Sequence, residues 1–141
     1  MTTSFIPEHE VYEYLSVAGI STPRHCFVDN ESQIADAPFE TGDPVVLKGI
    51  ARDLWHKSEA GALTFCDFDR DSVAKKHADM RETLGEKFDW LGTLVAERVE
   101  VRRARQAPSE IFVSLQRDHC CGAIISVGFG GLLTEDWARE L

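Results

Sequence analysis

Two lysines, a histidine, a serine and a glycine lie close together in the chain, in a pattern suited to phosphate. Lys48 ends the apolar run PVVL, and His56, Lys57, Ser58 and Gly61 follow in the polar segment HKSEAG. An unpaired buried ammonium group is costly, so Lys48 is expected to meet water or an anion. Ammonium, hydroxyl and backbone N–H groups together suit phosphate oxygens. The order is not that of a Walker A loop, so spacing alone leaves a nucleotide site and a set of turn residues equally open.

Two interpretations are open for the glycines near these residues. Gly49 and Gly61 are expected to expose backbone N–H donors to a phosphate group, because glycine lets the backbone approach a ligand closely. The alternative is that both are only turn residues.

Composition limits the class of protein. The chain has 141 residues, of which 43% are hydrophobic and 28% charged, which predicts one soluble domain or most of one. The net charge of −9 argues against a nucleic-acid binder, which needs Lys and Arg against phosphates. No apolar run approaches the roughly 20 residues that cross a bilayer, and the N-terminus turns acidic where a signal peptide would be apolar. A cytoplasmic protein with no membrane segment is therefore expected.

The cysteines lack the spacing of a zinc site. Cys26 and Cys66 stand alone, and Cys120 and Cys121 are adjacent, a placement that rarely allows a disulfide between them. Reduced thiols are the simpler prediction. A metal or redox site built on the segment DHCC, residues 118–121, remains the alternative.

Helical and strand patterns alternate through the first part of the chain. A helix is predicted over 7–18, with Val11, Leu15 and Ala18 on its apolar face and Gly19 ending it. The strand at 45–49 is apolar enough to be buried on both faces. The helix that starts at Asp69 or Asp71 has Val73, His77, Met80 and Leu84 on one face and ends at Gly85. The other predicted elements are a strand at 26–28, a brief helix at 31–37 and a strand at 63–66.

From residue 93 the hydrophobic period changes to two. Strands are predicted at 93–99, 110–117 and 122–128, and they indicate an antiparallel or mixed sheet, so the fold class is α+β. The basic connection between the first two strands contains Arg102, Arg103 and Arg105. A solvated loop is the simpler interpretation of these arginines, and a phosphate-facing role is the alternative.

Five segments in order resemble the ATP-grasp domain of NDP-forming acyl-CoA synthetases, relatives of the succinyl-CoA synthetase β chain. They are EVYEYLSVAGISTP, GDPVVLKG, HKSEAGAL, EIFVSLQRD and GFGGLLTE. The most specific parts are the strand lysine followed by His-Lys-Ser-Glu-x-Gly, and the distal Gly-x-Gly-Gly with a trailing Glu. The resemblance implies an ATP-grasp-like α+β fold, incomplete at its C-terminus. Residues 1–93 would form the first lobe with its N-terminal helix, and residues 94–141 would begin the second.

The resemblance also implies roles for particular residues. ATP or ADP would lie between two lobes, with Lys48 on its phosphates and Lys57, Ser58 and Gly61 in the loop beside them. His56 matches a histidine thought to relay a phosphoryl group in ADP-forming members, which neutral imidazole can do. The alternative is that His56 only binds phosphate or packs beside Trp55.

Four further residues are assigned through the same resemblance. Glu97 and Val99 belong to the inter-lobe segment that lies along the adenine, and Glu110 belongs to the nucleotide pocket. Glu135 would help to hold Mg²⁺, which prefers carboxylate oxygens. For Glu110 and Glu135, the alternative is a surface ion pair.

The expected function is a nucleotide-binding module that exchanges a phosphoryl group between ATP/ADP and an acyl phosphate through phosphohistidine. It would be an acid-CoA ligase only with a CoA-binding ligase domain or chain. Two alternatives are open for the remainder of the ATP-grasp domain: it lies on another chain, or the protein is a truncated form that has lost catalysis. A homo-oligomer is left open, and the sequence indicates neither the acyl substrate nor ATP over GTP. The competing class is a non-catalytic nucleotide-sensing or assembly module, and the third is a folded fragment that binds nothing.

Overall fold

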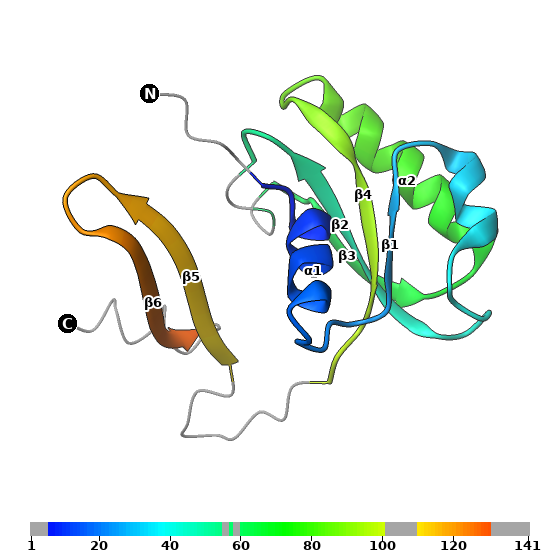
Figure 1. The fold of residues 1–141 in the computed structure, drawn as a ribbon. Helices are drawn as coiled ribbons and strands as arrows, with labels where there is room; N and C mark the ends of the chain where they lie inside the picture. The colour runs from blue at the N-terminus through cyan, green and yellow to red at the C-terminus, as the bar shows by residue number, and fades with distance from the viewer. Residues whose placement is uncertain (1–5, 55–56, 58–59, 101–109, 131–141) are drawn as a thin grey trace, which may run out of the picture. The chain divides into compact units, whose positions relative to one another are not determined.

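The chain forms two separate compact units, Met1–Val99 and Glu100–Leu141. The computed structural model describes residues 6–54, 57, 60–100 and 110–130. The first unit contains a sheet with helices on it, and the second contains a hairpin (Figure 1). The assignment of residues 1–93 and 94–141 to two ATP-grasp lobes stays a prediction.

The first unit is built on a four-stranded antiparallel sheet. Its strands are β1 (His25–Val28), β2 (Pro44–Ala51), β3 (Leu63–Asp67) and β4 (Trp90–Glu97), in the spatial order β1-β4-β2-β3. The strands predicted at 26–28, 45–49 and 63–66 are confirmed. The last strand of the unit begins at Trp90, earlier than the predicted residue 93. β2 therefore lies inside the sheet, between β4 and β3.

The sequence suggested that Lys48 ends its strand, but in the structure the strand continues beyond it. β2 continues to Ala51, because Gly49 and Ile50 still pair with Thr93 and Gly92 of β4. The lysine thus lies within a paired strand, where its side chain must point to one face of the sheet.

The two faces of β2 pack into different clusters. Val45 and Leu47 lie in the larger core beneath α2, whereas Val46 and Ile50 lie in a smaller cluster on the opposite face. All four of these side chains are buried, which confirms burial on both faces of the strand. By the alternation of a strand, Lys48 belongs to the same face as Val46 and Ile50.

Helix α2 (Arg70–Gly85) covers the larger core, with the short 3₁₀ helix η1 (Glu31–Asp36) beside it. Asp69 caps α2, because its carboxylate accepts a hydrogen bond from the Ser72 N–H at 2.9 Å. The buried face of α2 is the predicted one, consisting of Val73, His77, Met80 and Leu84. His77 is a helix-face residue as predicted, and its Nδ1 lies 2.9 Å from Thr93 Oγ1.

Helix α1 (Glu8–Val17) has the predicted extent but packs with a different face. Gly19 ends it with a φ of 77°, as its position suggested. The predicted apolar face is wrong, since Val11 is 37% exposed and α1 contains no buried residue. Instead, the His9 ring stacks on Phe27 with 3.8 Å between centroids, and Tyr12 packs against the smaller cluster. Polar and aromatic side chains thus make the contact of α1 with the sheet.

The second unit consists of the hairpin β5 (Glu110–Asp118) and β6 (Gly122–Gly130). The predicted antiparallel pairing is confirmed. The three strands predicted from residue 93 onward do not share one sheet, because β4 belongs to the sheet of the first unit, where it pairs with β1 and β2, whereas β5 pairs with β6. At the turn, the carboxylate of Asp118 accepts the N–H groups of Cys120 and Cys121, each at 2.8 Å. Gly122, with a φ of 81°, completes the turn.

One face of this hairpin is apolar and exposed. Residues opposite one another in the register fall on the same face. This face consists of the pairs Ile111 with Phe129, Val113 with Val127, and Leu115 with Ile125. Each of these side chains is at least 63% exposed. A two-stranded hairpin has no second layer of its own to bury such a face, and alone it is marginally stable in water.

Candidate anion-binding site

The two lysines that the sequence assigned to phosphate converge on one carboxylate. Lys48 Nζ lies 2.5 Å from Glu8 Oε1, and Lys57 Nζ lies 2.6 Å from Glu8 Oε2. The Tyr12 hydroxyl donates a third hydrogen bond to Glu8 Oε1 at 2.9 Å. Lys48 Nζ also lies 3.4 Å from the Tyr12 oxygen. The structure therefore brings two ammonium groups to one oxyanion, each on its own oxygen.

The charges of this cluster determine its ionisation. Burial alone would raise the pKa of Glu8, but the ammonium groups of Lys48 and Lys57 outweigh burial and lower that pKa to about 2. Burial alone would lower the pKa of Lys48, but Glu8 and Tyr12 raise it above its ordinary value. Both members of the ion pair Glu8–Lys48 are thus charged at neutral pH. Their side chains are 25% and 21% exposed, so the site is shielded without being closed to water.

The sequence explains how the cluster is assembled. Lys48 points to the α1 face of the sheet by strand alternation, and Lys57 belongs to the connection between β2 and β3. Gly61 turns this connection with a φ of 72°, and the Ala62 N–H donates to the Lys57 carbonyl at 2.8 Å. Glu8 is the first residue of α1, where a carboxylate favours the positive end of the helix dipole.

Sequence reasoning missed Glu8 and Tyr12. Both lie in α1, one turn apart, and their contact with Lys48 joins residues 40 and 36 positions away along the chain. The available signal was the acid at the first position after Pro7, which indicates a helix start but no partner.

Gly49 does not serve as a phosphate donor. Its N–H already donates to the Ala62 carbonyl at 2.7 Å, just beyond the last paired residues of β2 and β3. A Cβ at this position would lie 2.9 Å from Leu84 Cδ1 and 3.1 Å from Ala62 Cβ. The expected role was therefore wrong: this glycine allows α2 to pack closely on β2.

Three further residues were assigned to the nucleotide, Glu97 and Val99 to its adenine and Glu110 to the rest of the pocket. Glu97, at the end of β4, accepts the Arg24 N–H at 3.3 Å, and Arg24 Nε lies 3.6 Å from the same carboxylate oxygen. Val99 is 62% exposed just after β4. Glu110 begins β5 in the second unit, so its position relative to Lys48 is not defined. Contact of these residues with a nucleotide stays a prediction.

Three assigned residues lie outside the described residues: His56, Ser58 and Glu135. The arginines Arg102, Arg103 and Arg105 lie outside them as well. Among the residues that the structure describes, no group of three or more His, Cys, Asp or Glu side chains could hold a metal ion. A magnesium site therefore has no support from the described geometry, and no step can be assigned to it.

All four cysteines are free thiols, as predicted. Burial raises the pKa of the Cys26 thiol to about 11 and also raises that of Cys66. Cys120 and Cys121 are exposed at the hairpin turn. The described residues provide no metal cluster around the DHCC segment.

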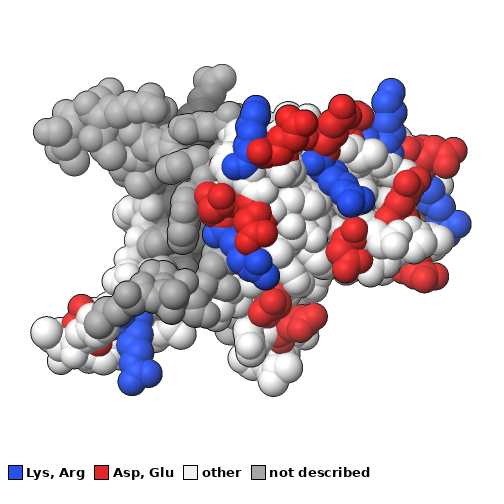
Figure 2. Space-filling model, turned by 90° about the horizontal axis from the view of Figure 1, so that it is seen from above, with Lys and Arg blue, Asp and Glu red and all other residues white. Residues whose placement is uncertain are grey.

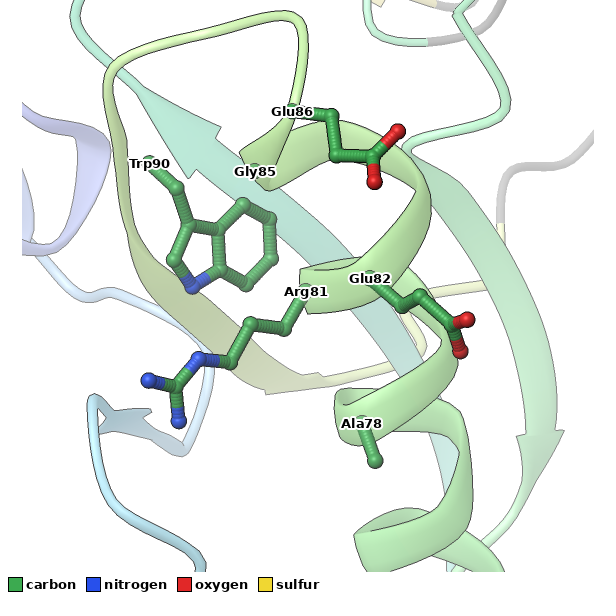
Figure 3. Close-up of a pocket in the computed structure, with 6 residues that line it drawn as sticks. All are labelled: Ala78, Arg81, Glu82, Gly85, Glu86 and Trp90. Atoms are coloured by element: carbon green, nitrogen blue, oxygen red, sulfur yellow. The ribbon is translucent and has the colours of Figure 1, made fainter.

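A shallow pocket of about 520 Å³ lies against the C-terminal half of α2. Figure 3 shows Trp90 and the extended Arg81 side chain along one side of the helix, with Glu82 and Glu86 directed away from the indole. Trp90 belongs to the core beneath α2, on the face of the sheet opposite to Lys48. This pocket is therefore separate from the lysine cluster.

The surface bears charges of both signs. Figure 2 shows acidic and basic side chains interspersed on the face it presents, without a large area of one sign among the coloured residues. Within the described parts of the chain, no helix has the length and apolar character that crossing a membrane requires.

The sequence is similar to that of known CoA ligases. It is 30% identical over 134 residues to a trans-feruloyl-CoA synthase from an unknown prokaryotic organism, covering 92% of this chain and 18% of that protein. It is 29% identical over 129 residues to an ADP-forming acetate–CoA ligase from Archaeoglobus fulgidus, covering 91% and 18%. The β subunit of an ADP-forming acetate–CoA ligase from Pyrococcus furiosus is 28% identical over 133 residues, covering 91% and 54%.

Solved structures show the same relationship. A dinucleotide-forming acetyl-coenzyme A synthetase from Candidatus Korarchaeum cryptofilum, in complex with coenzyme A, Ca-AMPCP and HgCl⁺, has a TM-score of 0.69 and 26% identity. The alignment covers 89% of this chain and 54% of that one. A Pyrococcus horikoshii protein has a TM-score of 0.71 and 25% identity, covering 93% and 55%.

These comparisons confirm the predicted α+β ATP-grasp fold. The chain spans about half the length of the Pyrococcus furiosus subunit and of these solved chains, and 18% of the longer ligases, so it corresponds to a part of each of these proteins. A profile of the ATP-grasp domain matches residues 2–140. The chain belongs to the ATP-grasp domain family, and its relatives are ADP-forming acetate–CoA and acyl-CoA ligases.

Proposed function

We propose that this chain is the nucleotide-binding module of an NDP-forming acyl-CoA synthetase, with Lys48 and Lys57 on the phosphates of ATP or ADP. The observation that carries the proposal is the convergence of both ammonium groups on one oxyanion, the carboxylate of Glu8. Two cations fixed within hydrogen-bond reach of one acceptor group form a ready binding geometry for phosphate oxygens. A solved relative in complex with Ca-AMPCP supports the same class of ligand.

The chemical part of the proposal rests on His56. A γ-phosphoryl group would move from ATP to an imidazole nitrogen of His56 with release of ADP. It would then leave that nitrogen and pass, by way of the CoA-ligase partner, to a carboxylate oxygen of the acid, which forms the acyl phosphate and frees the imidazole. Ser58 and Gly61 would line the phosphates, and Glu97, Val99 and Glu110 would contribute to the nucleotide pocket. If Mg²⁺ takes part, as in other phosphoryl transfers, Glu135 is the proposed ligand, and the ion would neutralise phosphate charge.

A partner is part of the proposal as well. The exposed apolar face of the β5–β6 hairpin needs a covering layer, and the relatives are longer chains or subunits of assemblies. We propose that the remainder of the ATP-grasp domain covers this face, and that a CoA-binding ligase domain or chain supplies the acyl chemistry. A cytoplasmic location also belongs to the proposal.

The proposal is tested by measuring ADP binding calorimetrically for the wild type and Lys48→Met. Loss of one charge-assisted hydrogen bond should weaken binding by about 1.5–3 kcal/mol. Lys75→Met is the matched control, because Lys75 is exposed on α2 and its loss changes the net charge equally. Unchanged affinity in Lys48→Met, with both variants folded, would reject the assignment of Lys48 to the nucleotide.

The second candidate is a module that binds nucleotide without phosphoryl transfer. One observation favours it: both lysines already donate to the carboxylate of Glu8, so the cluster is held together by the protein's own groups and needs no phosphoryl transfer to explain it. Nucleotide binding without any phosphorylation of the chain would support this candidate over the enzyme. No binding at all would leave a folded module without a nucleotide role.

A further inference from the structure

The carboxylate of Glu8 occupies the position that a phosphate group would need. Its two oxygens accept from different lysines, at 2.5 Å from Lys48 and 2.6 Å from Lys57. Two adjacent oxygens of a phosphate could take the same two hydrogen bonds, because phosphate offers several equivalent acceptors. A phosphate group that takes these two hydrogen bonds in this position must displace the Glu8 carboxylate, because the two anions would occupy the same space.

The charge balance favours exchange of one anion for the other. One carboxylate carries a single negative charge between two ammonium groups, and so it leaves one positive charge uncompensated within the cluster. A terminal phosphate group carries about −1.5 to −2 at neutral pH and would neutralise both cations. The described cluster is thus stable without a ligand but better matched to a phosphoryl anion.

Helix α1, which carries Glu8, is attached to the sheet by limited contacts. It contains no buried residue, and Glu8 is its first residue. Beneath α1, the buried Nδ1 of His9 has no hydrogen-bond partner among the described residues. The first turn of α1 is held at the sheet by the stacking of His9 on Phe27 and by the ion pairs of Glu8, so a small shift of this turn would withdraw Glu8 from the lysines.

We infer that Glu8 is an internal competitor for the phosphate site: it holds Lys48 and Lys57 in the free protein and releases them when a phosphoryl anion binds. This inference rests on the proposed nucleotide-binding function and deepens it. It adds a role for the N-terminal helix, which sets the affinity of the site by the strength of its carboxylate contacts. No covalent bond is made or broken in this exchange.

The test compares Glu8→Gln with Glu13→Gln by calorimetric titration with ADP and, separately, with inorganic pyrophosphate. Gln keeps the size of the side chain and removes its charge, so it competes less well for two ammonium groups. Glu8→Gln should bind both probes about tenfold more tightly than the wild type, the scale of one charge-assisted contact. Glu13→Gln is the control, because Glu13 is exposed on the same helix and its change alters the net charge equally.

Each outcome has a separate meaning. ADP binding by the wild type with no gain in Glu8→Gln over Glu13→Gln would overturn the inference and leave the proposed function standing. Weaker binding by Glu8→Gln would also overturn it, since Glu8 would then be organising the lysines for the ligand. A gain for ADP but not for pyrophosphate would reject competition for the phosphate groups. Binding of neither probe by any variant would overturn the proposed function together with the inference.

A second variant covers the case in which Glu8→Gln fails to fold. Glu8→Asp keeps the charge but is shorter by one methylene group, so its carboxylate cannot reach both lysines from the same helix position. It should bind both probes more tightly than the wild type, by less than tenfold. Wild-type affinity in this variant would contradict a competition that depends on reaching both lysines.

Discussion

Lys48 Nζ and Glu8 Oε1 lie 2.5 Å apart, although 40 residues separate them along the chain. This contact joins the first residue of α1 to the middle of β2, on the sheet face opposite to α2. Burial alone would lower the pKa of Lys48, but the Glu8 carboxylate raises it, so the contact with an anion favours the charged form of a lysine in a paired inner strand. The anion is part of the protein, which makes the first helix part of the site.

The stability of the protein should depend on pH through Glu8. Because the pKa of Glu8 in the folded protein is about 2, against an ordinary 4.5, the folded state favours the ionised carboxylate. Its contribution is therefore fully present above pH 4.5 and is lost as pH falls towards 2. The shift corresponds to at most about 3 kcal/mol, which screening by water reduces. Urea unfolding of the wild type and Glu8→Gln between pH 7 and pH 2 measures it.

The wild type should exceed Glu8→Gln in unfolding free energy at pH 7, and the difference should vanish near pH 2. Glu13→Gln should show no comparable difference from the wild type, because Glu13 is exposed. A gap between the wild type and Glu8→Gln that stays constant over this range would show that the ion pairs do not lower the pKa of Glu8.

Local patterns predicted most elements of the first unit. The α2 face with Val73, His77, Met80 and Leu84 follows from helical spacing, and the burial of β2 follows from its apolar run. The α1 face could not be predicted in this way. Its contacts with the sheet are made by His9, Tyr12 and Glu8, residues that hydrophobic spacing ignores, and their partners are distant in the sequence.

The candidate site was also predicted only in part, because local sequence signals identify its lysines but not the distant acid that binds them. A lysine within an apolar run stands out locally, so Lys48 was found, and the loop composition drew attention to Lys57. The acid that binds both is one of several in an acidic helix start, and only the folded sheet distinguishes Glu8 from Glu10 or Glu13. Gly49 was misassigned because close packing against Leu84 leaves no signal in the adjacent sequence.

Two strand glycines should differ in their tolerance of a methyl group. A Cβ at Gly92 would lie 2.5 Å from the Val28 carbonyl oxygen and 2.6 Å from Phe27 Cζ. The carbonyl is backbone in the neighbouring strand, so it can move only with β1. Gly92→Ala should therefore lower the free energy of unfolding by about 3 kcal/mol, the upper end of overpacking costs. Denaturant unfolding monitored by circular dichroism measures the loss.

Gly49→Ala should cost less, about 1–2 kcal/mol, because its nearest contact is the end of the Leu84 side chain, which can rotate. Gly85→Ala is the control, since its nearest contact is an ordinary 3.9 Å and alanine favours the helix. Equal stability of Gly92→Ala and Gly85→Ala would mean that β1 and β4 are less closely packed than described.

The last prediction separates a phosphoryl carrier from a phosphate ligand at His56. A carrier must form a covalent adduct, so incubation with magnesium and ATP labelled at the γ-phosphate, with and without a CoA-ligase chain, should label the wild type. His56→Ala should lose the label and keep nucleotide affinity within about tenfold, because Lys48 and Lys57 remain. His119→Ala is the matched control, since His119 is exposed at the hairpin turn and should label normally. Phosphohistidine is lost in acid and survives base, which distinguishes it from a phosphoserine at Ser58.

A label that persists in His56→Ala would place the adduct on another residue and end the carrier assignment. If the wild type binds ADP but takes up no label, with or without the CoA-ligase chain, the binding module is favoured. A histidine that only binds phosphate never forms an adduct, and its substitution lowers the nucleotide affinity. The labelling rate of Glu8→Gln provides a further test. If withdrawal of Glu8 is what admits the phosphates, that variant should label faster than the wild type at low ATP and equally fast at saturation, since its effect is on binding and not on the transfer step.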